Sequence, residues 1–342
     1  MIRQIAEYLH EHREELDLPS GLRSDFSFLK VGGNPWEKGR INFLVFNRDE
    51  SAPVLFIKGI REKDKDESLR REYSLIQKLA SHRELIPFLP LPIHMVSLSG
   101  QDVLIQKACR GERMLASLSK SSLLHFQKKT ISGNFYRAME FVSILNTSVQ
   151  NPFSPTELKS KILSPFLSFY EDYGCSEHNK YTLERLLHKV CHLMGDSPCG
   201  TLIHGDCSAT NIFLDTPNQI KIIDWETASE NSLPFLDLFY FMSKYIHNLK
   251  IMPRNRWERV RYAYFGKNWF SDLIRKTVQE YCEQTHVSPE LGHVIFPLHF
   301  LNKARIKYSM RAKEQTEPWM NLFEYSMNNL DVKNTSRQDC SW

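Results

Sequence analysis

Short apolar runs, separated by polar or glycine-rich turns, occupy the first third of the chain. They predict strands over residues 27–31, 41–46, 54–58 and 103–105. Between the last two runs, apolar side chains recur at spacings of three and four and predict a helix over residues 67–81. An amphipathic pattern at the amino terminus predicts one more helix. We therefore expect this part of the chain to form an antiparallel sheet with two helices.

Beyond about residue 112 the pattern becomes helical. Its clearest stripe, over residues 183–194, repeats at i, i+3, i+4, i+7, i+8 and i+11. The chain thus predicts an α+β, bilobal fold, with a small β-rich amino-terminal lobe and a larger, mainly helical carboxyl-terminal lobe. We expect the lobes to cover residues 1–107 and 108–330, followed by a flexible tail over residues 331–342.

Composition restricts the class of protein. The 342 residues are 42% hydrophobic and 25% charged, which is ordinary for a soluble chain, and the net charge of +4 is too small to indicate nucleic acid by itself. No apolar run reaches the roughly 18–20 residues of a membrane span, and the charged amino terminus does not resemble a signal peptide. The seven cysteines lack C-x-x-C spacing, which favours reduced thiols. We therefore expect a cytoplasmic protein that binds neither nucleic acid nor membrane and has no obligate protein partner.

The most informative segment covers residues 201–226. Two short apolar runs flank a tight turn there and predict a β-hairpin, which would bring Asp224 back towards Asp206 and Asn211. Two carboxylates and an amide can hold Mg²⁺ and accept a proton from a hydroxyl group, as phosphoryl transfer requires. Asp224 stands between two isoleucines and a tryptophan, so we expect it to be hydrogen-bonded or metal-bound.

A second charged pair follows from the helical pattern. Glu72 shares the apolar stripe of the helix predicted over residues 67–81, and a carboxylate on that face needs a cation partner. Lys58, at the end of the preceding strand, is the natural candidate. A Lys–Glu pair of this kind holds the lysine extended towards the phosphates of a nucleotide.

Three further features support these groups. Asp237 lies in a helix that is apolar on every face, so we expect it to bond backbone amides of the loop around His204. His204 directly follows a strand, which favours a packing and hydrogen-bonding role over that of a general base. The loop that contains Gly32 and Gly33 joins the first two strands and would set backbone amides over a triphosphate.

Together these residues resemble the signature of the aminoglycoside phosphotransferase and choline kinase superfamily. The similarity covers about residues 25–245 and is most specific over residues 201–226. The residues that carry it are His204, Gly205, Asp206, Asn211, Ile223, Asp224, Trp225 and Glu226, with Lys58, Glu72, Asp237 and Leu238 at matching places. The resemblance implies a protein-kinase-like fold, ATP or another nucleoside triphosphate, and Mg²⁺.

The resemblance also implies a role for each group at the centre of the reaction. Asp206 would orient and deprotonate the hydroxyl group of the acceptor. Asn211 and Asp224 would bind the metal ion. Lys58, with Glu72 as its partner, would steady the phosphates.

The nucleotide base is assigned in the same way. The adenine would lie against the connector between the lobes and bond its backbone near Gln106, Lys107 and Ala108. The phosphate loop with Gly32 and Gly33 is unlike that of the better-known antibiotic enzymes. The choice of nucleotide therefore stays open at this point.

The acceptor is expected to be a small polar alcohol, either sugar-like or an amino alcohol. From residue 243 onward there are 16 Lys plus Arg against 10 Asp plus Glu, which argues against a polycationic aminoglycoside unless a local acidic patch is present. Choline would need an aromatic cage, and the rings of Trp225, Trp257 and Tyr264 are more typical of a core.

Other classes of function explain fewer residues. A non-catalytic pseudokinase that serves as a binding protein would be favoured if Asp206, Asn211, Asp224 or Lys58 were missing, and all four are present. A protein kinase is not excluded, but the chain has no recognisable HRD or DFG pair. Glycoside cleavage by two aspartates would leave Lys58 and Asn211 without a role.

Overall fold

The structure is a computed structural model. It describes residues 2–16, 18, 26–31, 40–47, 50–60, 67–91, 93–118, 124–174, 177–195, 198–216, 219–309 and 313–329. By their contacts these residues form two compact units. The first unit comprises Met1–Ser117 and Thr210–Thr227, and the second comprises Leu118–Ala209 and Ala228–Trp342.

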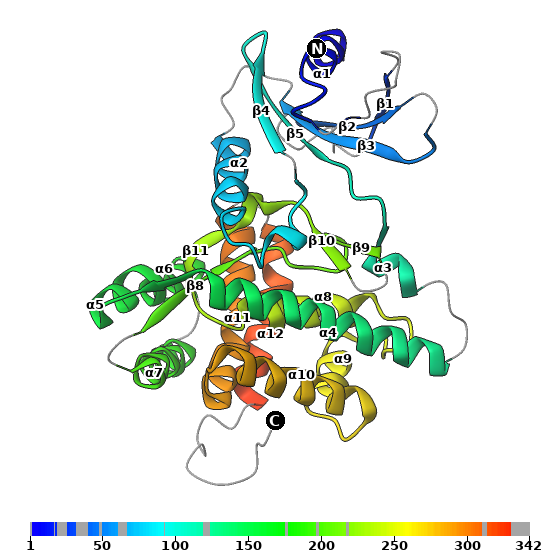
Figure 1. The fold of residues 1–342 in the computed structure, drawn as a ribbon. Helices are drawn as coiled ribbons and strands as arrows, with labels where there is room; N and C mark the ends of the chain where they lie inside the picture. Colours follow the sequence, from blue (N-terminus) through cyan, green and yellow to red (C-terminus); the bar gives the residue numbers. More distant parts are fainter. Residues whose placement is uncertain are drawn as a thin grey trace. The chain divides into compact units, whose positions relative to one another are not determined.

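The first unit is built on a five-stranded antiparallel sheet with the strand order β1-β2-β3-β5-β4 (Figure 1). Its elements in chain order are α1 (Ile2–Glu11), β1 (Phe26–Lys30), β2 (Arg40–Asn47), β3 (Pro53–Ile60), α2 (Glu67–Leu79), the short helix η1 (Ile86–Phe88), β4 (Ile93–Leu98), β5 (Gln101–Lys107), β6 (Glu112–Arg113), α3 (Met114–Ser117), β9 (Ile212–Thr216), β10 (Gln219–Ile222) and the short helix η4 (Trp225–Thr227). The pairing of β3 with β5 sets Lys58 opposite Leu104 and Phe56 opposite Gln106.

Each face of this sheet is covered by a helix because successive side chains of a strand point to opposite faces. On one face Ile5 and Leu9 of α1 pack with Val45, Ile57 and Ile105 in a buried apolar cluster. On the other face α2 is tied to the sheet by charge. Arg70 donates two hydrogen bonds to Asp102, at 2.6 and 3.1 Å. Lys58 belongs to this charged face, where its neighbours are polar groups rather than the apolar cluster.

A second, three-stranded sheet has the order β10-β9-β6. Gly111 precedes β6 and lies so close to β9 that a Cβ atom there would stand 1.8 Å from the carbonyl oxygen of Leu214, so only glycine fits. The pairing of β9 with β6 carries the segment of the hairpin into the first unit. For this reason the first unit extends beyond the predicted boundary at residue 107 and gains a separate stretch of chain.

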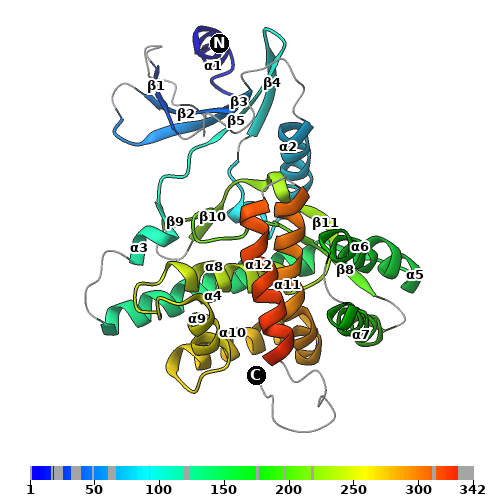
Figure 2. The same ribbon diagram turned by 180° about the vertical axis from the view of Figure 1, so that it is seen from behind.

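The second unit is mainly helical. Its elements are α4 (Leu124–Ser148), β7 (Gln150–Pro152), α5 (Pro155–Glu157), the π-helix η3 (Leu158–Leu163), α6 (Ser164–Tyr173), α7 (Glu177–Met194), β8 (Cys199–Ile203), β11 (Ser229–Ser232), α8 (Leu236–Asn248), α9 (Arg256–Tyr264), α10 (Trp269–Thr285), α11 (Pro289–Ser309) and α12 (Lys313–Asn329). Its one described sheet has the order β11-β8-β7. Figure 2 shows α12 running alongside α11.

Aromatic side chains fill the core of the second unit. Phe135 of α4 meets Phe241 and Tyr245 of α8 and Phe270 of α10, with ring centroids 5.2–5.5 Å apart. Edge-to-face contacts of this kind add to the free energy gained by burial. They fix α8, the helix that carries Asp237, against its neighbours.

Most of the predicted elements are present. The predicted strands correspond to β1, β2, β3 and β5, and the predicted helices to α1, α2 and α7. Strand β4 was not predicted, because its sequence IHMVSL mixes apolar and polar residues directly after a proline-rich stretch. The predicted tail over residues 331–342 lies outside the described residues.

Two expectations from composition bear on the described residues alone. None of the helices in that part of the chain is both long and apolar enough to cross a membrane. The cysteines described there are free thiols, namely Cys109, Cys191, Cys199, Cys207 and Cys282.

Candidate active site

The first unit contains a buried ionic cluster of Lys58, Glu72 and Asp224. The ammonium group of Lys58 donates to both carboxylate oxygens of Glu72, at 2.8 and 2.9 Å, and to Oδ1 of Asp224 at 2.9 Å. Lys58 is only 6% exposed and Glu72 1%. The Lys58–Glu72 contact predicted from the helical stripe is therefore present.

Electrostatics keep Lys58 charged. Burial disfavours the ammonium form, but the carboxylates of Glu72 and Asp224 outweigh this effect and raise the pKa of Lys58 above its usual value. The side chain of Asp224 is 36% exposed, so the cluster opens to solvent on one side. Lys58 is therefore held in its charged form beside a carboxylate that solvent reaches.

The backbone around Asp224 is unusual. Asp224 has a φ of +70°, in the left-handed region that few residues other than glycine, asparagine and aspartate adopt readily. The next residue, Trp225, is 1% exposed, and its backbone N–H donates to Oε1 of Glu72 at 3.2 Å. Its indole N–H bonds the carbonyl oxygen of Ile222 at 3.1 Å. Trp225 thus anchors the turn that directs the carboxylate of Asp224 to Lys58.

The predicted hairpin joins Asn211 to Asp224. Strands β9 and β10 pair with Ile212 opposite Ile222, and the N–H of Ile223 donates to the carbonyl oxygen of Asn211 at 3.0 Å. Asn211 and Asp224 therefore flank the same end of the hairpin. One carboxylate and one amide oxygen suit a hard cation such as Mg²⁺, whose other ligands come from phosphates and water. Metal binding by these residues stays a prediction.

Two residues of the connector, Lys107 and Ala108, pair with strand β3 of the five-stranded sheet. The N–H of Ala108 donates to the carbonyl oxygen of Val54 at 3.1 Å, and Lys107 lies opposite Leu55 in the ladder. The N–H of Ala108 is therefore engaged within the sheet, and the contact of this segment with a base stays a prediction. Gln106 is 1% exposed, and its Oε1 has no hydrogen-bond partner among the described residues. Gly32 and Gly33, predicted to cover the phosphates, lie outside the described residues.

The second unit contains Asp206, in the loop that follows β8. The hydroxyl of Tyr240 donates to its Oδ1 at 2.5 Å, and Nζ of Lys303 lies 3.5 Å from the same oxygen. Partial burial alone would raise the pKa of Asp206, but Lys303 and Tyr240 outweigh it and bring the pKa below its usual value. Asp206 is therefore ionised at neutral pH, as a proton acceptor must be.

Asp237 holds the backbone of the loop that precedes Asp206 through two hydrogen bonds. Its Oδ2 accepts the N–H of His204 at 2.5 Å, and its Oδ1 accepts the N–H of Gly205 at 3.0 Å. The predicted hydrogen bonds of Asp237 to this loop are thus present. His204 is fully buried, and its Nδ1 accepts the N–H of Asp206 at 3.2 Å. This contact agrees with the hydrogen-bonding role expected of His204.

The chain is similar to one family of known proteins over part of its length. The profile of the Ecdysteroid kinase-like family matches residues 123–267, a span that includes Asp206, Asn211 and Asp224. No curated protein sequence matches the chain.

Solved structures of small-molecule kinases have a similar fold. Choline kinase LicA from Streptococcus pneumoniae is 14% identical with a TM-score of 0.51, covering 94% of this chain and 97% of its own. The GDP complex of aminoglycoside 2′-phosphotransferase-IIIa is 14% identical with a TM-score of 0.50, covering 94% and 98%. A candidate fructosamine-3-kinase from Thermobifida fusca is 14% identical with a TM-score of 0.51, covering 88% and 93%. The chain has a protein-kinase-like fold.

This similarity confirms the α+β class and the protein-kinase-like fold that the resemblance implied. At 14% identity the likeness concerns the fold. The residues of the site therefore have to be judged by their own geometry and chemistry.

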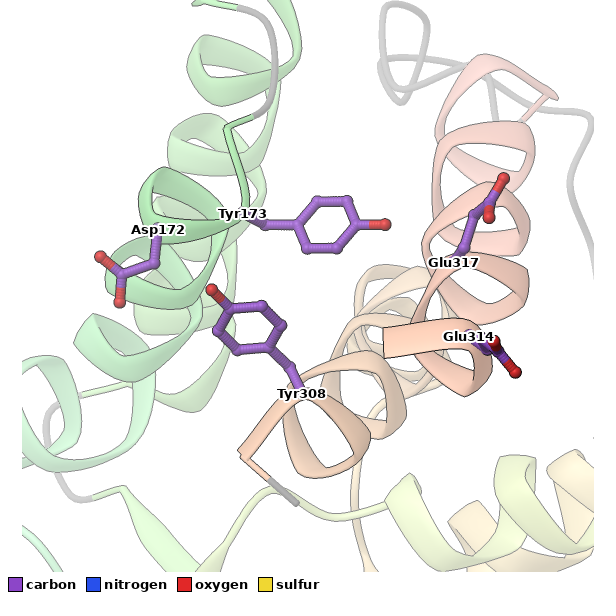
Figure 3. A pocket seen from close by; sticks show the side chains of 5 residues that line it. All are labelled: Asp172, Tyr173, Tyr308, Glu314 and Glu317. Carbon is purple, nitrogen blue, oxygen red and sulfur yellow. The ribbon is translucent and has the colours of Figure 1, made fainter. Parts of the chain in front are cut away.

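The helical unit of the kinase-like fold also contains a pocket of about 390 Å³, lined by Asp172, Tyr173, Tyr308, Glu314 and Glu317. Figure 3 shows the two tyrosine rings, from α6 and α11, with the glutamates on α12 across from them, and the carboxylates of Asp172, Glu314 and Glu317 all turned away from the rings. The ring centroids are 6.0 Å apart. A site of this volume is suited to a small molecule.

One lining residue of this pocket shares a helix with Lys303, which contacts Asp206. Lys303 and Tyr308 are both on α11, and five residues of helix span about 7.5 Å. Trp319 of α12 packs on the ring of Tyr240, with centroids 6.0 Å apart. The aromatic residues considered from the sequence are elsewhere, since Trp225 and Tyr264 are buried in the cores of their units.

Neither Tyr240 nor Lys303 was predicted from the sequence. The sequence does contain a feature that points to each residue. Tyr240 follows Asp237 by three residues on the same predicted helix, and Lys303 follows a long apolar run. A lysine at the end of such a run indicates a buried partner. The sequence did not show which carboxylate that partner is.

Proposed function

We propose that the protein transfers the γ-phosphate of ATP, in the presence of Mg²⁺, to a hydroxyl group of a small polar molecule. The observation that carries this proposal is the Lys58–Glu72–Asp224 cluster, in which a buried lysine is held charged at the accessible edge of a kinase-like sheet. The ionised Asp206 of the second unit supports it. A pseudokinase role would leave this aspartate without a purpose.

The chemistry divides between the two units. In the first unit Asn211 and Asp224 would hold Mg²⁺, which when bound neutralises charge on the phosphate oxygens. Lys58 would bind the phosphates and Glu72 would keep its side chain extended. In the second unit Asp206 would accept the proton of the acceptor hydroxyl. The new bond forms between that oxygen and the γ-phosphorus, and the bond from the γ-phosphorus to the β-phosphate oxygen breaks, releasing ADP.

Gln106 supports ATP as the nucleotide. Its side chain is on the strand next to that of Lys58, is buried, and carries an amide oxygen that has no partner among the described residues. A buried acceptor without a donor costs free energy. A base that reached this oxygen would have to donate to it, as the exocyclic amino group of adenine does and the carbonyl of guanine at the same place does not.

The pocket beside α11 supports an amino alcohol as the acceptor. Two tyrosine rings attract a cation through their faces, and the glutamates of α12 across from them add a negative potential. The surplus of basic residues after residue 243 therefore does not describe this pocket. The structural relatives include a choline kinase and an aminoglycoside phosphotransferase, and both names denote cationic acceptors.

The test is ADP release from Mg-ATP with a panel of acceptors. The panel contains sugars, amino alcohols, aminoglycosides and, because of the matching family profile, a hydroxylated steroid. We expect an amino alcohol to give the highest kcat/KM, and Tyr308→Leu to raise its KM by about tenfold through loss of the cation–π contact. The Asp206→Asn protein controls for contaminating kinases. Binding of Mg-ATP without ADP release for any acceptor would favour a binding protein instead.

A further inference from the structure

Lys303 of α11 is a buried cation that the proposed reaction does not yet use. It is 5% exposed, in a stretch of helix where Phe300, Leu301 and Ala304 are fully buried. A cation in such surroundings is costly unless it is paired and hydrogen-bonded. A well-packed apolar residue often replaces a buried charge without loss of stability, so stability alone does not account for Lys303.

Every described contact of its ammonium group concerns Asp206 or that residue's immediate surroundings. Nζ donates to the carbonyl oxygen of Gly205 and lies 3.5 Å from Oδ1 of Asp206. It also lies 3.5 Å from the centroid of the Tyr240 ring, a cation–π distance. The ammonium group of Lys303 therefore contacts the backbone before Asp206, the carboxylate of Asp206, and the ring of Tyr240, whose hydroxyl bonds that carboxylate.

Tyr240 completes the arrangement. Its hydroxyl donates to Oδ1 of Asp206 at 2.5 Å, the same oxygen that Lys303 approaches. Tyr240 is one turn beyond Asp237 on α8, so both project to one face of the helix. Asp237 holds the N–H groups of His204 and Gly205. Helix α8 therefore fixes the backbone of the loop with one side chain and its carboxylate with the other.

We propose that Lys303, together with Tyr240, is a positioning residue that keeps the carboxylate of Asp206 ionised and in one orientation for the acceptor hydroxyl. The inference rests on the proposed function and adds to it two residues from helices distant in sequence. Neither residue is expected to touch the acceptor, because Lys303 is almost wholly buried and both act on Oδ1 of Asp206.

The charges around Lys303 set its protonation. Burial is the main influence and lowers the pKa of Lys303 to about 8, while Asp206 and Asp237 oppose it and Lys307 adds to it. The titratable groups near Lys303 are Asp206 and Cys207 in the loop, Asp237 and Tyr240 on α8, and His299 and Lys307 on α11 itself. Lys303 is therefore mostly protonated at pH 7, where its charge acts on Asp206.

The first experiment is the pH profile of Mg-ATP hydrolysis, with water as the acceptor, in Lys303→Met. We expect kcat to fall about a hundredfold, because the base loses its orientation. The acidic limb of kcat/KM should move up by about one pH unit, since an opposite charge at this distance lowers a carboxyl pKa by that much or more. The thermal shift produced by Mg-ATP should be unchanged.

Three further variants separate positioning from packing. Lys303→Arg keeps a positive charge and should restore the acidic limb to its wild-type position. Tyr240→Phe keeps the ring and removes only the hydroxyl, so kcat should fall about tenfold with a smaller upward move of the limb. Lys276→Met, at an exposed lysine of α10, is the control and should change kcat by less than about twofold.

A double-mutant cycle in Tm gives a readout that needs no catalysis. The change in Tm caused by Lys303→Met is measured in the wild type and in the Asp206→Asn protein. We expect a smaller decrease of Tm in the Asp206→Asn protein, because the negative partner charge is absent there. Equal effects in both backgrounds, or an unmoved acidic limb in Lys303→Met and Tyr240→Phe, would overturn the proposal. A different outcome would refute the proposed function but not the contact: the two substitutions are coupled in Tm, yet the wild-type protein neither binds nor hydrolyses Mg-ATP.

Discussion

Two lysines of this protein are buried to nearly the same extent and have opposite properties. Lys58 in the first unit is 6% exposed and Lys303 in the second unit 5%. The pKa of Lys58 is raised, whereas that of Lys303 is lowered to about 8. The number of close carboxylates makes the difference. Lys58 bonds two carboxylates at 2.8–2.9 Å, while Lys303 has one at 3.5 Å.

The contrast shows that burial alone does not decide the charge of a lysine. The carboxylates beside Lys58 raise its pKa and favour its charged form, which suits a group that binds phosphate. Lys303 can lose its charge close to physiological pH, which suits a group that adjusts a neighbouring base. Four experiments test the different roles of the two units that hold these lysines.

The largest effect is expected from Asp206→Asn. Phosphotransfer should fall by about a thousandfold, because the amide cannot accept the proton of the acceptor. The Mg-ATP thermal shift should persist, since the cluster around Lys58 is intact. Measuring kcat and the thermal shift on the same preparation tests both statements. A parallel loss of nucleotide binding would contradict the division of roles between the units.

Asp224→Ala should instead abolish the binding of Mg-ATP. Without this carboxylate the metal loses its charged protein ligand, so Mg-ATP should no longer raise Tm. In the wild type, ATP at a hundred times Kd stabilises the fold by about 2.7 kcal/mol, which a thermal shift detects. Asp215→Ala on strand β9 is the matched control and should keep the shift. A normal shift in Asp224→Ala would remove Asp224 from the site.

Glu72→Gln tests the pairing of Lys58 more gently. Lys58 would keep Asp224, so we expect kcat/KM to fall by about tenfold rather than to vanish. Stability should fall by about 2 kcal/mol, because a buried ionic cluster loses one charge. Urea unfolding and steady-state kinetics measure the two effects. An unchanged kcat/KM would mean that the position of Lys58 does not depend on Glu72.

The smallest effect concerns pH. The charge of Lys303 is present below its folded pKa of about 8 and is lost as pH rises through that value. Activity of the wild type should therefore decline by a few fold above about pH 8, and Lys303→Arg should flatten this decline. Lysine in the unfolded chain titrates near 10.4, so the unfolded state binds more protons between these values. The stability of the wild type relative to Lys303→Met should accordingly rise with pH there, as Tm at pH 7.5 and 9.5 would show.

Local patterns predicted what depends on neighbours in the sequence. The Lys58–Glu72 pair followed from one strand end and one helical stripe, and the hairpin of Asn211 and Asp224 from two apolar runs around a turn. Tyr240 and Lys303 meet Asp206 from 34 and 97 residues away, and no local pattern carries that information. The pocket was missed for the same reason, because it joins α6, α11 and α12, while a count of charges averages over all surfaces.

The left-handed backbone at Asp224 limits which residues can occupy this position even before catalysis is considered. Asparagine and glycine accept that conformation, and β-branched side chains resist it. A saturation library at position 224 that is sorted for soluble expression alone should already be enriched in Asp, Asn and Gly.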